Sequence, residues 1–339
     1  MGYDLKNRLV IGIASSALFN LKDSDAVFND QGEKAYRRYQ EENLEACLMP
    51  GVAFPFIKRL LSLNDLSQSI EDPLVEVIVL SRNDPDTGLR VMNSIEKHGL
   101  PISRAIFMQG KSPYKFMPAL NMSLFLSANE KDVAEAIGLG LPAGRVIESA
   151  FVDDAEDTDL RIAFDFDGVL ADDLPEQINT REGLPRFHAH EKENATKAHG
   201  PGPLRDFLRN VNRIQRIEES RREIARKEGQ VYRMRLHVAL VTARNAPSHL
   251  RAVNSLKQWG VTVNDAFFLG GVDKGTITEV LKPHIFFDDQ HGHLTRTSQN
   301  APSVHVPFGE LNRPAGEDST EDSFASAITT DDDLGGMTP

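Results

Sequence analysis

Two segments of the amino-acid sequence that lie 161 residues apart resemble each other. Residues 81–129 match residues 242–290 without a gap, and ten of the paired positions are identical. A repeat of this length restricts the fold strongly, because both copies are expected to form the same unit of structure. Earlier in the chain the separation is 151 residues, so ten additional residues lie within the second copy. We therefore expect two copies of one unit, at residues 1–150 and 155–312.

Short apolar runs recur in both copies and are separated by stretches long enough for helices. The runs expected to form buried strands are 9–13, 75–80, 124–126, 160–164, 236–241 and 285–287. Amphipathic stretches at 88–98 and 249–259 lie between them, and this alternation is typical of parallel sheets with crossover helices. The predicted fold class is α/β, with two tandem Rossmann-like units that each contain a parallel sheet. Residues 205–228 combine an apolar stripe with mixed charges, which predicts an ordinary solvated helix.

Composition narrows the class of protein. The 339 residues are 40% hydrophobic and 26% charged, as in ordinary globular proteins. The net charge is −12, and seven of the acids lie within residues 315–339, which contain no Lys or Arg. We expect a disordered acidic tail at 313–339 and no broad basic surface for a nucleic acid polymer or an anionic membrane.

Two further features concern the environment of the chain. No apolar run approaches the ~20 residues that a membrane span requires. The single cysteine, Cys47, cannot form an internal disulfide, which fits a reducing compartment. The sequence therefore predicts a cytoplasmic protein that does not bind membranes.

Two carboxylates directly follow a predicted strand of the second copy. In the run IAFDFDGV, Asp165 and Asp167 are two residues apart, so on an extended segment they project the same way. Gly168 permits a sharp exit from the strand. Such a pair at the carboxyl end of a strand suits Mg²⁺, which takes one or two carboxylates and accepts a phosphate oxygen from a substrate.

Three later groups follow strands or begin helices in the same copy. Thr242 ends one apolar strand, Lys274 precedes a helix, and the pair Asp288 and Asp289 ends another strand. We expect these groups to converge on Asp165 and to form a phosphate and metal site. Lys274 and Mg²⁺ would neutralise phosphate charge, and Thr242 would hold phosphate oxygens.

The four motifs, in this order, resemble those of the haloacid dehalogenase superfamily of phosphotransferases. The resemblance covers residues 155–312 and implies that the chain is a metal-dependent hydrolase. It implies that Asp165 is the nucleophile that forms an aspartyl-phosphate, and that Asp167 is the general acid and base. It also implies catalytic roles for Thr242 and Lys274, and a Mg²⁺ shell of Asp165, Asp167 and Asp288, with Asp289 as neighbour or substitute.

Over residues 9–308 the chain is also similar to the cytosolic 5′-nucleotidase type I family. The motifs that carry this similarity are LVIGIASSALF, VLSRNDPDTGLRVMNSIEKHGLP, FDFDGVLADD, HEKEN, GPL, LVTAR and PHIFFDDQ. Membership would imply Mg²⁺-dependent hydrolysis of nucleoside 5′-monophosphates, AMP prominently. Ala17 departs from the animal members, which carry Arg in that motif, so no contact of that Arg is carried over.

The repeat predicts that only the second copy is catalytic. In the first copy, Ala14 and Ser16 stand at the positions of Asp165 and Asp167, and Ser127 and Ala128 stand at those of Asp288 and Asp289. No nucleophile and no metal-binding carboxylate remain at these positions. We expect a degenerate haloacid dehalogenase-type unit at 1–150 that supports or completes the substrate site.

Candidate substrate contacts come from three places. Residues 171–200 lie where superfamily members insert a small cap, and there Glu191 and Lys192 are candidates to contact ribose or phosphate. Arg244 follows Thr242 directly. In the first copy, Arg82 and Asn83 are candidates for nucleoside recognition, and a plain turn followed by a helix cap is the alternative for that segment. His188, His190 and His199 lack zinc-ligand spacing and are expected at the surface.

Two other functions remain open at this point. The motifs specify phosphoryl chemistry and not the leaving group, so a phosphatase of another small phosphoester, such as a sugar phosphate, is one alternative. A nucleotide-binding regulatory protein with a slow site is the other. The expected partner in the first reading is a small nucleoside monophosphate, and the sequence leaves homo-oligomer formation open.

Overall fold

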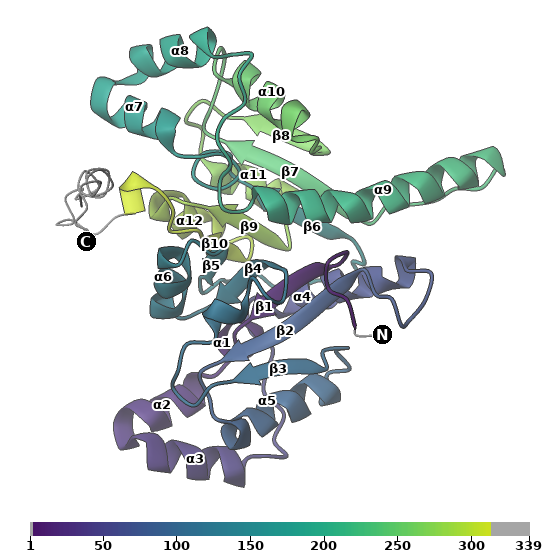
Figure 1. Ribbon diagram of the computed structural model, residues 1–339, viewed down its shortest axis with the longest axis vertical. Helices are drawn as coiled ribbons and strands as arrows, with labels where there is room; N and C mark the ends of the chain where they lie inside the picture. The colour runs from purple at the N-terminus through teal and green to yellow at the C-terminus, as the bar shows by residue number, and fades with distance from the viewer. Residues whose placement is uncertain (1–2, 313–339) are drawn as a thin grey trace, which may run out of the picture.

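A single ten-stranded sheet forms the centre of the molecule, and helices cover it (Figure 1). The computed structural model describes residues 3–312, so the expected tail at 313–339 lies outside the described residues. The strands are β1 (Leu9–Ile13), β2 (Val75–Ser81), β3 (Arg104–Phe107), β4 (Met122–Ser127), β5 (Ala143–Val146), β6 (Leu160–Phe164), β7 (Leu236–Thr242), β8 (Asp265–Phe268), β9 (Ile285–Asp288) and β10 (Ser303–His305).

The two halves of the chain have the same strand order. The sheet runs β3-β2-β1-β4-β5-β10-β9-β6-β7-β8, so each half, counted from its own first strand, has the order 3-2-1-4-5. Neighbouring strands are parallel throughout, except that β5 and β10 are antiparallel where the halves meet. The two expected parallel sheets are thus joined edge to edge. Because their strands run in opposite senses, the carboxyl ends of the first and second halves lie on different rims of the sheet.

The α-helices connect the strands in both halves. They are α1 (Ser15–Leu18), α2 (Lys22–Gln31), α3 (Glu33–Glu42), α4 (Phe54–Ser62), α5 (Pro85–Lys97), α6 (Glu130–Gly138), α7 (Leu174–Glu182), α8 (Leu184–Glu193), α9 (Arg205–Lys227), α10 (His249–Trp259), α11 (Lys274–Leu281) and α12 (His291–Thr297). The α/β class and the three helices predicted from sequence, α5, α9 and α10, are confirmed.

All six strands expected from apolar runs are present. The four others, β3, β5, β8 and β10, are only three or four residues long, and β3 and β8 lie at the two edges of the sheet and are partly exposed. Strands β3 and β8 contain short apolar runs, at 105–108 and 266–269, that the prediction did not use, whereas β5 and β10 lack a continuous apolar run, which is the signal on which the prediction depends.

Each half carries a helical hairpin between its first and second strands. The hairpin α7–α8 occupies the expected cap segment 171–200, and α2–α3 is its counterpart in the first half (Figure 1). Gly183 and Gly32 join the two helices of each hairpin with φ of 83° and 79°. This conformation favours glycine. The hairpin α2–α3 was not predicted, because its sequence differs from that of α7–α8.

Both hairpins are fixed to the body by equivalent hydrogen bonds from an arginine. Arg90 Nε donates to the carbonyl of Ala46, and Arg251 Nε donates to that of Lys197, each at 3.0 Å. Arg90 Nη1 also reaches Gln40 Oε1 at 3.2 Å. Arg251 makes the corresponding bond to Glu191 Oε1 at 2.7 Å. These bonds explain why the arginines are identical in the repeat.

A serine one turn further along the same helix repeats this symmetry. Ser94 Oγ accepts the amide of Leu48, and Ser255 Oγ accepts the amide of His199, both at 3.0 Å. The sequence repeat therefore corresponds to a repeated set of contacts between helix and hairpin.

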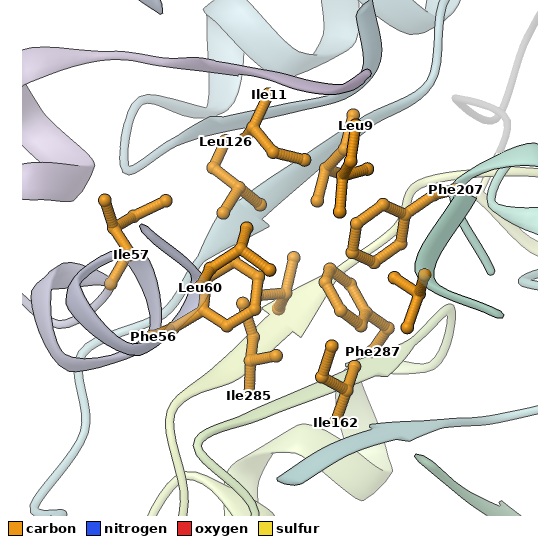
Figure 2. Close-up of a cluster of buried hydrophobic side chains, with 14 of the residues drawn as sticks. Leu9, Ile11, Phe56, Ile57, Leu60, Leu126, Ile162, Phe207, Ile285 and Phe287 are labelled. Atoms are coloured by element: carbon orange, nitrogen blue, oxygen red, sulfur yellow. The ribbon is translucent and has the colours of Figure 1, made fainter. Parts of the chain in front are cut away.

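One apolar core spans the two halves. Leu9 and Ile11 of β1 face Ile162 of β6 and Phe287 of β9, and Phe56 of α4 lies among them (Figure 2). In addition, α4 contacts β6, and α9 contacts β1 and β4, so helices cross from one half to the other. Burial of apolar surface contributes roughly 25 cal/mol per Å². This shared core therefore makes the stability of each half depend on the other.

Candidate active site

The ends of three adjacent strands bring the acidic motifs together. Strands β9, β6 and β7 are neighbours, and the residues at or just beyond their carboxyl ends are Asp288, Asp165 and Thr242. The backbone amide of Asp165 donates to the carbonyl of Phe287 at 2.8 Å, which continues the pairing of β6 with β9. Asp165 is therefore held by the sheet at the rim where the second half's strands end.

Lys274 connects the acids at the centre of this rim. It begins α11, is 2% exposed, and its Nζ lies 2.7 Å from Oδ2 of Asp165 and 2.7 Å from Oδ2 of Asp288. Burial disfavours the ammonium, but the two carboxylates hold the pKa of Lys274 above its usual value. The motif residues Asp165, Lys274 and Asp288, which are 123 positions apart at most, therefore form one buried ionic cluster.

The pKa values of the two carboxylates of this cluster are shifted in opposite directions. Burial raises the pKa of Asp165 to about 6, with Asp288 and Asp167 adding to the effect and Lys274 opposing it. Burial also acts to raise the pKa of Asp288, but Lys274 and His293 outweigh it and hold that pKa below its usual value. Both groups are therefore mainly ionised at neutral pH.

Asp289 is the least compensated acid of the site. It is buried, and its Oδ1 has no hydrogen-bond partner in the described structure. Burial and the charges of Asp165 and Asp288 raise its pKa to about 9. Gly168 lies against it with φ of 68°, and a Cβ there would come within 2.5 Å of Asp289 Oδ2. The close approach of the two segments thus requires glycine at 168.

The donor set fits a hard divalent cation. Asp165, Asp288 and His293 each offer one ligand atom, and these atoms lie within 4.8 Å of one another. The unpartnered oxygen of Asp289 is beside this group, and an uncompensated buried carboxylate favours a nearby cation. The carboxylate oxygens of Asp165 and Asp288, rather than the imidazole of His293, are the donors that suit Mg²⁺. His293, whose Nδ1 is 3.2 Å from Asp288, was not among the residues predicted from sequence.

Asp167, although expected in the metal shell, is paired with Arg244. Arg244 is 4% exposed, and its Nε and Nη2 donate to the two oxygens of Asp167 at 2.7 and 2.6 Å. Parallel bonds of this type fix the orientation of both planar groups. Arg244, expected as a substrate contact, therefore orients Asp167 in this structure.

Arg244 belongs to a second buried ionic cluster, which links the site to the hairpin. Its Nη1 donates to Glu191 Oε2, and its Nη2 lies 3.1 Å from His199 Nε2. Glu191, 1% exposed, also accepts from Arg251 at 2.7 Å and lies 3.0 Å from His199. Burial opposes ionisation of Glu191, but His199 and Arg244 hold its pKa well below the usual value. Helix α8 is thereby joined to Asp167 through charged contacts.

His199 differs from its expected surface position. It is 3% exposed, with Nδ1 2.8 Å from Ser255 Oγ, and burial lowers its pKa. It is kept in the interior because both ring nitrogens find partners there. The sequence did not single out Arg251 as a site residue, although its identity with Arg90 in the repeat was a signal for it.

The remaining candidates lie in two other environments. Thr242 is buried, and its hydroxyl accepts the amide of Arg244 at 3.3 Å. Lys192 is exposed on α8. Arg82 pairs with Asp132 at 3.0 Å, and Asn83 lies 3.5 Å from Tyr36; both follow β2, whose carboxyl end is on the other rim of the sheet.

Replacement of Asp289 by Asn is expected to stabilise the metal-free protein above neutral pH. A carboxyl whose pKa is raised from 3.8 to about 9 contributes stability while it is protonated and loses that contribution as pH rises toward 9. The metal-free wild type should therefore unfold more easily at pH 8.5 than at pH 5.5. Urea unfolding in EDTA at both pH values tests this, and the variant should show a smaller difference. An unchanged difference would contradict it.

Two comparisons relate most of this chain to 5′-nucleotidases. A family model described as 5′-nucleotidase matches residues 1–313. Human cytosolic 5′-nucleotidase 1B is 33% identical over 293 residues, which are 85% of this chain and 47% of that protein. The chain thus spans about half the length of this curated relative.

Two other observations carry less weight. The alignment with a solved structure of S. aureus MnaA with UDP covers 84% of this chain and 75% of that chain, with 12% identity and a TM-score of 0.16. So low a score supports no argument about fold or ligand. Within residues 3–312, no helix is both long enough and apolar enough to cross a membrane.

Proposed function

Because the chain belongs to the 5′-nucleotidase family, we propose that it hydrolyses nucleoside 5′-monophosphates, AMP among them, to nucleoside and phosphate with Mg²⁺. The observation that most supports this is the position of Lys274, whose ammonium lies 2.7 Å from both Asp165 and Asp288. One buried cation between two acids at adjacent strand ends fits a site that transfers a phosphoryl group.

The proposed reaction has two in-line steps. In the first, a carboxylate oxygen of Asp165 attacks phosphorus, the bond from phosphorus to O5′ breaks, and Asp167 gives its proton to the departing O5′. In the second, water attacks phosphorus of the aspartyl-phosphate, Asp167 takes the proton of that water, and phosphate leaves as the Asp165 carboxylate is restored. Dividing hydrolysis in this way gives attack and proton transfer to separate groups.

The metal would be held by the carboxylates of Asp165 and Asp288, with Asp289 and His293 beside them. When bound, Mg²⁺ would neutralise phosphate charge and orient the phosphate for attack. Lys274 would contribute a second positive charge from the protein itself. Thr242 would hold a phosphate oxygen through its hydroxyl.

Arg244 has a consequence for the proton transfer step. Both oxygens of Asp167 accept from Arg244 at 2.6 and 2.7 Å, and this favours the carboxylate that must accept a proton from water. Donation of a proton to O5′ requires that one of these bonds open when substrate binds. The buried contacts of Glu191 with Arg244 place the cap helix α8 where its movement would control that opening.

We further propose that the first half is a duplicated unit that has lost catalysis. Its strand order is the same, and the amide of Ala14 donates to Leu126 O at 2.8 Å as that of Asp165 does to Phe287 O. Side chains at the equivalent positions carry no carboxylate. The shared core supports a role in holding the catalytic half in shape.

A panel of phosphoesters tests the proposal. AMP, other nucleoside monophosphates and sugar phosphates would be compared by phosphate release, with Mg²⁺ and with EDTA. We expect the largest kcat/KM for a nucleoside 5′-monophosphate and loss of activity in EDTA. A sugar phosphate as best substrate would favour the broader phosphatase, and tight AMP binding without phosphate release would favour a regulatory protein.

Replacement of Glu191 by Gln is expected to lower kcat by about 10- to 100-fold, because Arg244 and Asp167 lose the charge that positions them. The repeat supplies a matched control, since Gln40 occupies the same position against Arg90 in the first half. The reverse change, Gln40→Glu, should leave kcat unchanged. Equal kcat values for both variants and wild type would show that α8 does not position the site.

A further inference from the structure

The residues that follow β10, 306–312, make contacts with both the acidic site and the hairpin α7–α8 (Figure 1, the yellow end of the chain). We refer to residues 306–312 as the strap. The amide of Val306 donates to the carbonyl of Asp288 at 2.9 Å, which continues the pairing of β10 with β9. Further along, the strap turns back on itself, because the amide of Asn312 donates to the carbonyl of Gly309 at 3.2 Å. This turn brings the side chain of Asn312 back to the acidic site.

Two side-chain donors meet at the backbone carbonyl of Asp289. Asn312 Nδ2 lies 3.1 Å from this oxygen, and His305 Nε2 lies 3.0 Å from it. The same His305 nitrogen is 3.0 Å from Asn312 Oδ1, so it faces two acceptors and carries the hydrogen. Asn312 Nδ2 also donates to the carbonyl of Phe308 at 2.8 Å. Because both lone pairs of the Asp289 carbonyl are occupied, the peptide that carries this buried acid is held in one orientation.

The strap is also attached to the start of α7. Asp173 Oδ2 accepts the amide of Glu310 at 2.7 Å, and Arg181 of α7 pairs with the carboxylate of Glu310. Gly309 lies against Asp173 with φ of 83°, and a Cβ there would come within 2.4 Å of Asp173 Oδ2. So close an approach, in this conformation, requires glycine. The strap therefore connects the first turn of α7 with Asp289.

The first half has a weaker connection at the corresponding place. Lys22, at the start of α2, stands 151 residues before Asp173, and its Nζ lies 2.7 Å from Oε1 of Glu148, just after β5. Both side chains are largely exposed, and an exposed ion pair contributes little stability. In that half Ala128 stands at the position of Asp289. The tighter connection between hairpin and sheet is therefore found in the half that carries the acids.

From these contacts we propose that the strap couples the hairpin to the acid pair Asp288 and Asp289, and that Asn312 is a positioning residue of the acidic site. Asn312 fixes the peptide of Asp289, so the two adjoining carboxylates stay where a divalent cation can bind between the strand ends. Glu191 links α8 to Asp167 through an arginine, so each helix of the hairpin is tied to one acidic strand end. The inference rests on the proposed function only in its use of the metal site, and metal binding can be measured without turnover.

The test measures Mg²⁺ binding to the full chain by calorimetry and, separately, phosphate release from AMP. Asn312→Ala removes both donated bonds and is expected to weaken Mg²⁺ binding about tenfold and to lower kcat about tenfold, with KM for AMP nearly unchanged. Asn312→Gln keeps the amide and should recover part of the loss. Because Asn312 is only half-buried, both variants should unfold at nearly the urea concentration of the wild type. Wild-type Mg²⁺ affinity in Asn312→Ala would overturn the proposal.

A double variant tests whether α7 acts through the strap. Asp173→Ala removes the acceptor of the Glu310 amide and should weaken Mg²⁺ binding about threefold, whereas Asp173→Asn keeps an acceptor oxygen and should bind Mg²⁺ nearly as the wild type does. If both residues act through one strap, Asp173→Ala/Asn312→Ala should lose no more affinity than Asn312→Ala alone. Losses that multiply in the double variant would show that Asp173 acts independently and would overturn the coupling.

Lys22→Met is the matched control in the first half. It breaks the exposed ion pair with Glu148 and should leave both Mg²⁺ affinity and kcat unchanged. Equal effects of Lys22→Met and Asp173→Ala would show a general loosening of the hairpins and would overturn the strap. If Asn312→Ala loses Mg²⁺ affinity but the wild type releases no phosphate, the proposed hydrolysis is contradicted and the strap is supported. Phosphate release with wild-type Mg²⁺ affinity in Asn312→Ala would give the opposite result.

Discussion

Asp165→Asn is expected to abolish phosphate release from AMP, with a fall in kcat of at least about 10⁴-fold. The amide has nearly the shape of the carboxylate and can still accept from Lys274, so the buried cluster stays filled. What it lacks is the ionised oxygen that attacks phosphorus. Initial rates with Mg²⁺ and circular dichroism of the variant would be measured together.

Asp65→Asn supplies the control for this variant. Asp65 is an exposed acid that pairs with Arg235 outside the acidic site, so its replacement should leave kcat unchanged. Retained turnover in Asp165→Asn, with the protein folded, would contradict an aspartyl-phosphate on this residue.

Among the variants proposed here, Lys274→Met is expected to lower the free energy of unfolding most. It removes the ammonium from between two buried carboxylates and leaves Asp165 and Asp288 to repel each other. Removal of one partner from a buried ionic cluster costs about 3–5 kcal/mol. Urea unfolding in EDTA at pH 7 measures this loss directly.

Unfolding in the presence of Mg²⁺ and a control variant at a surface lysine test whether the loss is specific to the buried acids. A divalent cation would replace part of the missing positive charge, so Mg²⁺ should raise the midpoint of unfolding more in Lys274→Met than in the wild type. Lys131→Met, at an exposed position on α6, should be nearly neutral under both conditions. A variant as stable as the wild type in EDTA would mean that the buried acids do not need Lys274.

Much of the fold could be predicted from periodicity and from the repeat. The six apolar runs that were expected to be strands are strands, because a strand buried on both faces favours a continuous run such as Val77–Leu80. The order of the strands could not be predicted in the same way, because pairing depends on contacts between distant segments. That β5 and β10 pair, and in antiparallel orientation, follows from no local signal in two strands of four and three residues.

The acidic site, like the fold, could be predicted only in part. Asp165, Lys274 and Asp288 were predicted as one site because each follows a strand or begins a helix at one rim. The ion pair of Asp167 with Arg244 was not predicted. Arg244 meets Glu191 and His199 only where the hairpin α7–α8 packs on α10. Arg251 and Arg90 show how such contacts can be found, because identical residues in a weak repeat mark the shared docking contacts.

The position of β10 has a consequence for synthesis of the chain. This strand, Ser303–His305, pairs with β5 on one side and β9 on the other, although it is the last strand of the described chain. Before this strand is synthesised, β5 and β9 each lack a partner on the side that it later covers. Nascent chains must therefore protect those edges from neighbouring polypeptides, and premature termination before residue 303 would leave both permanently open to aggregation.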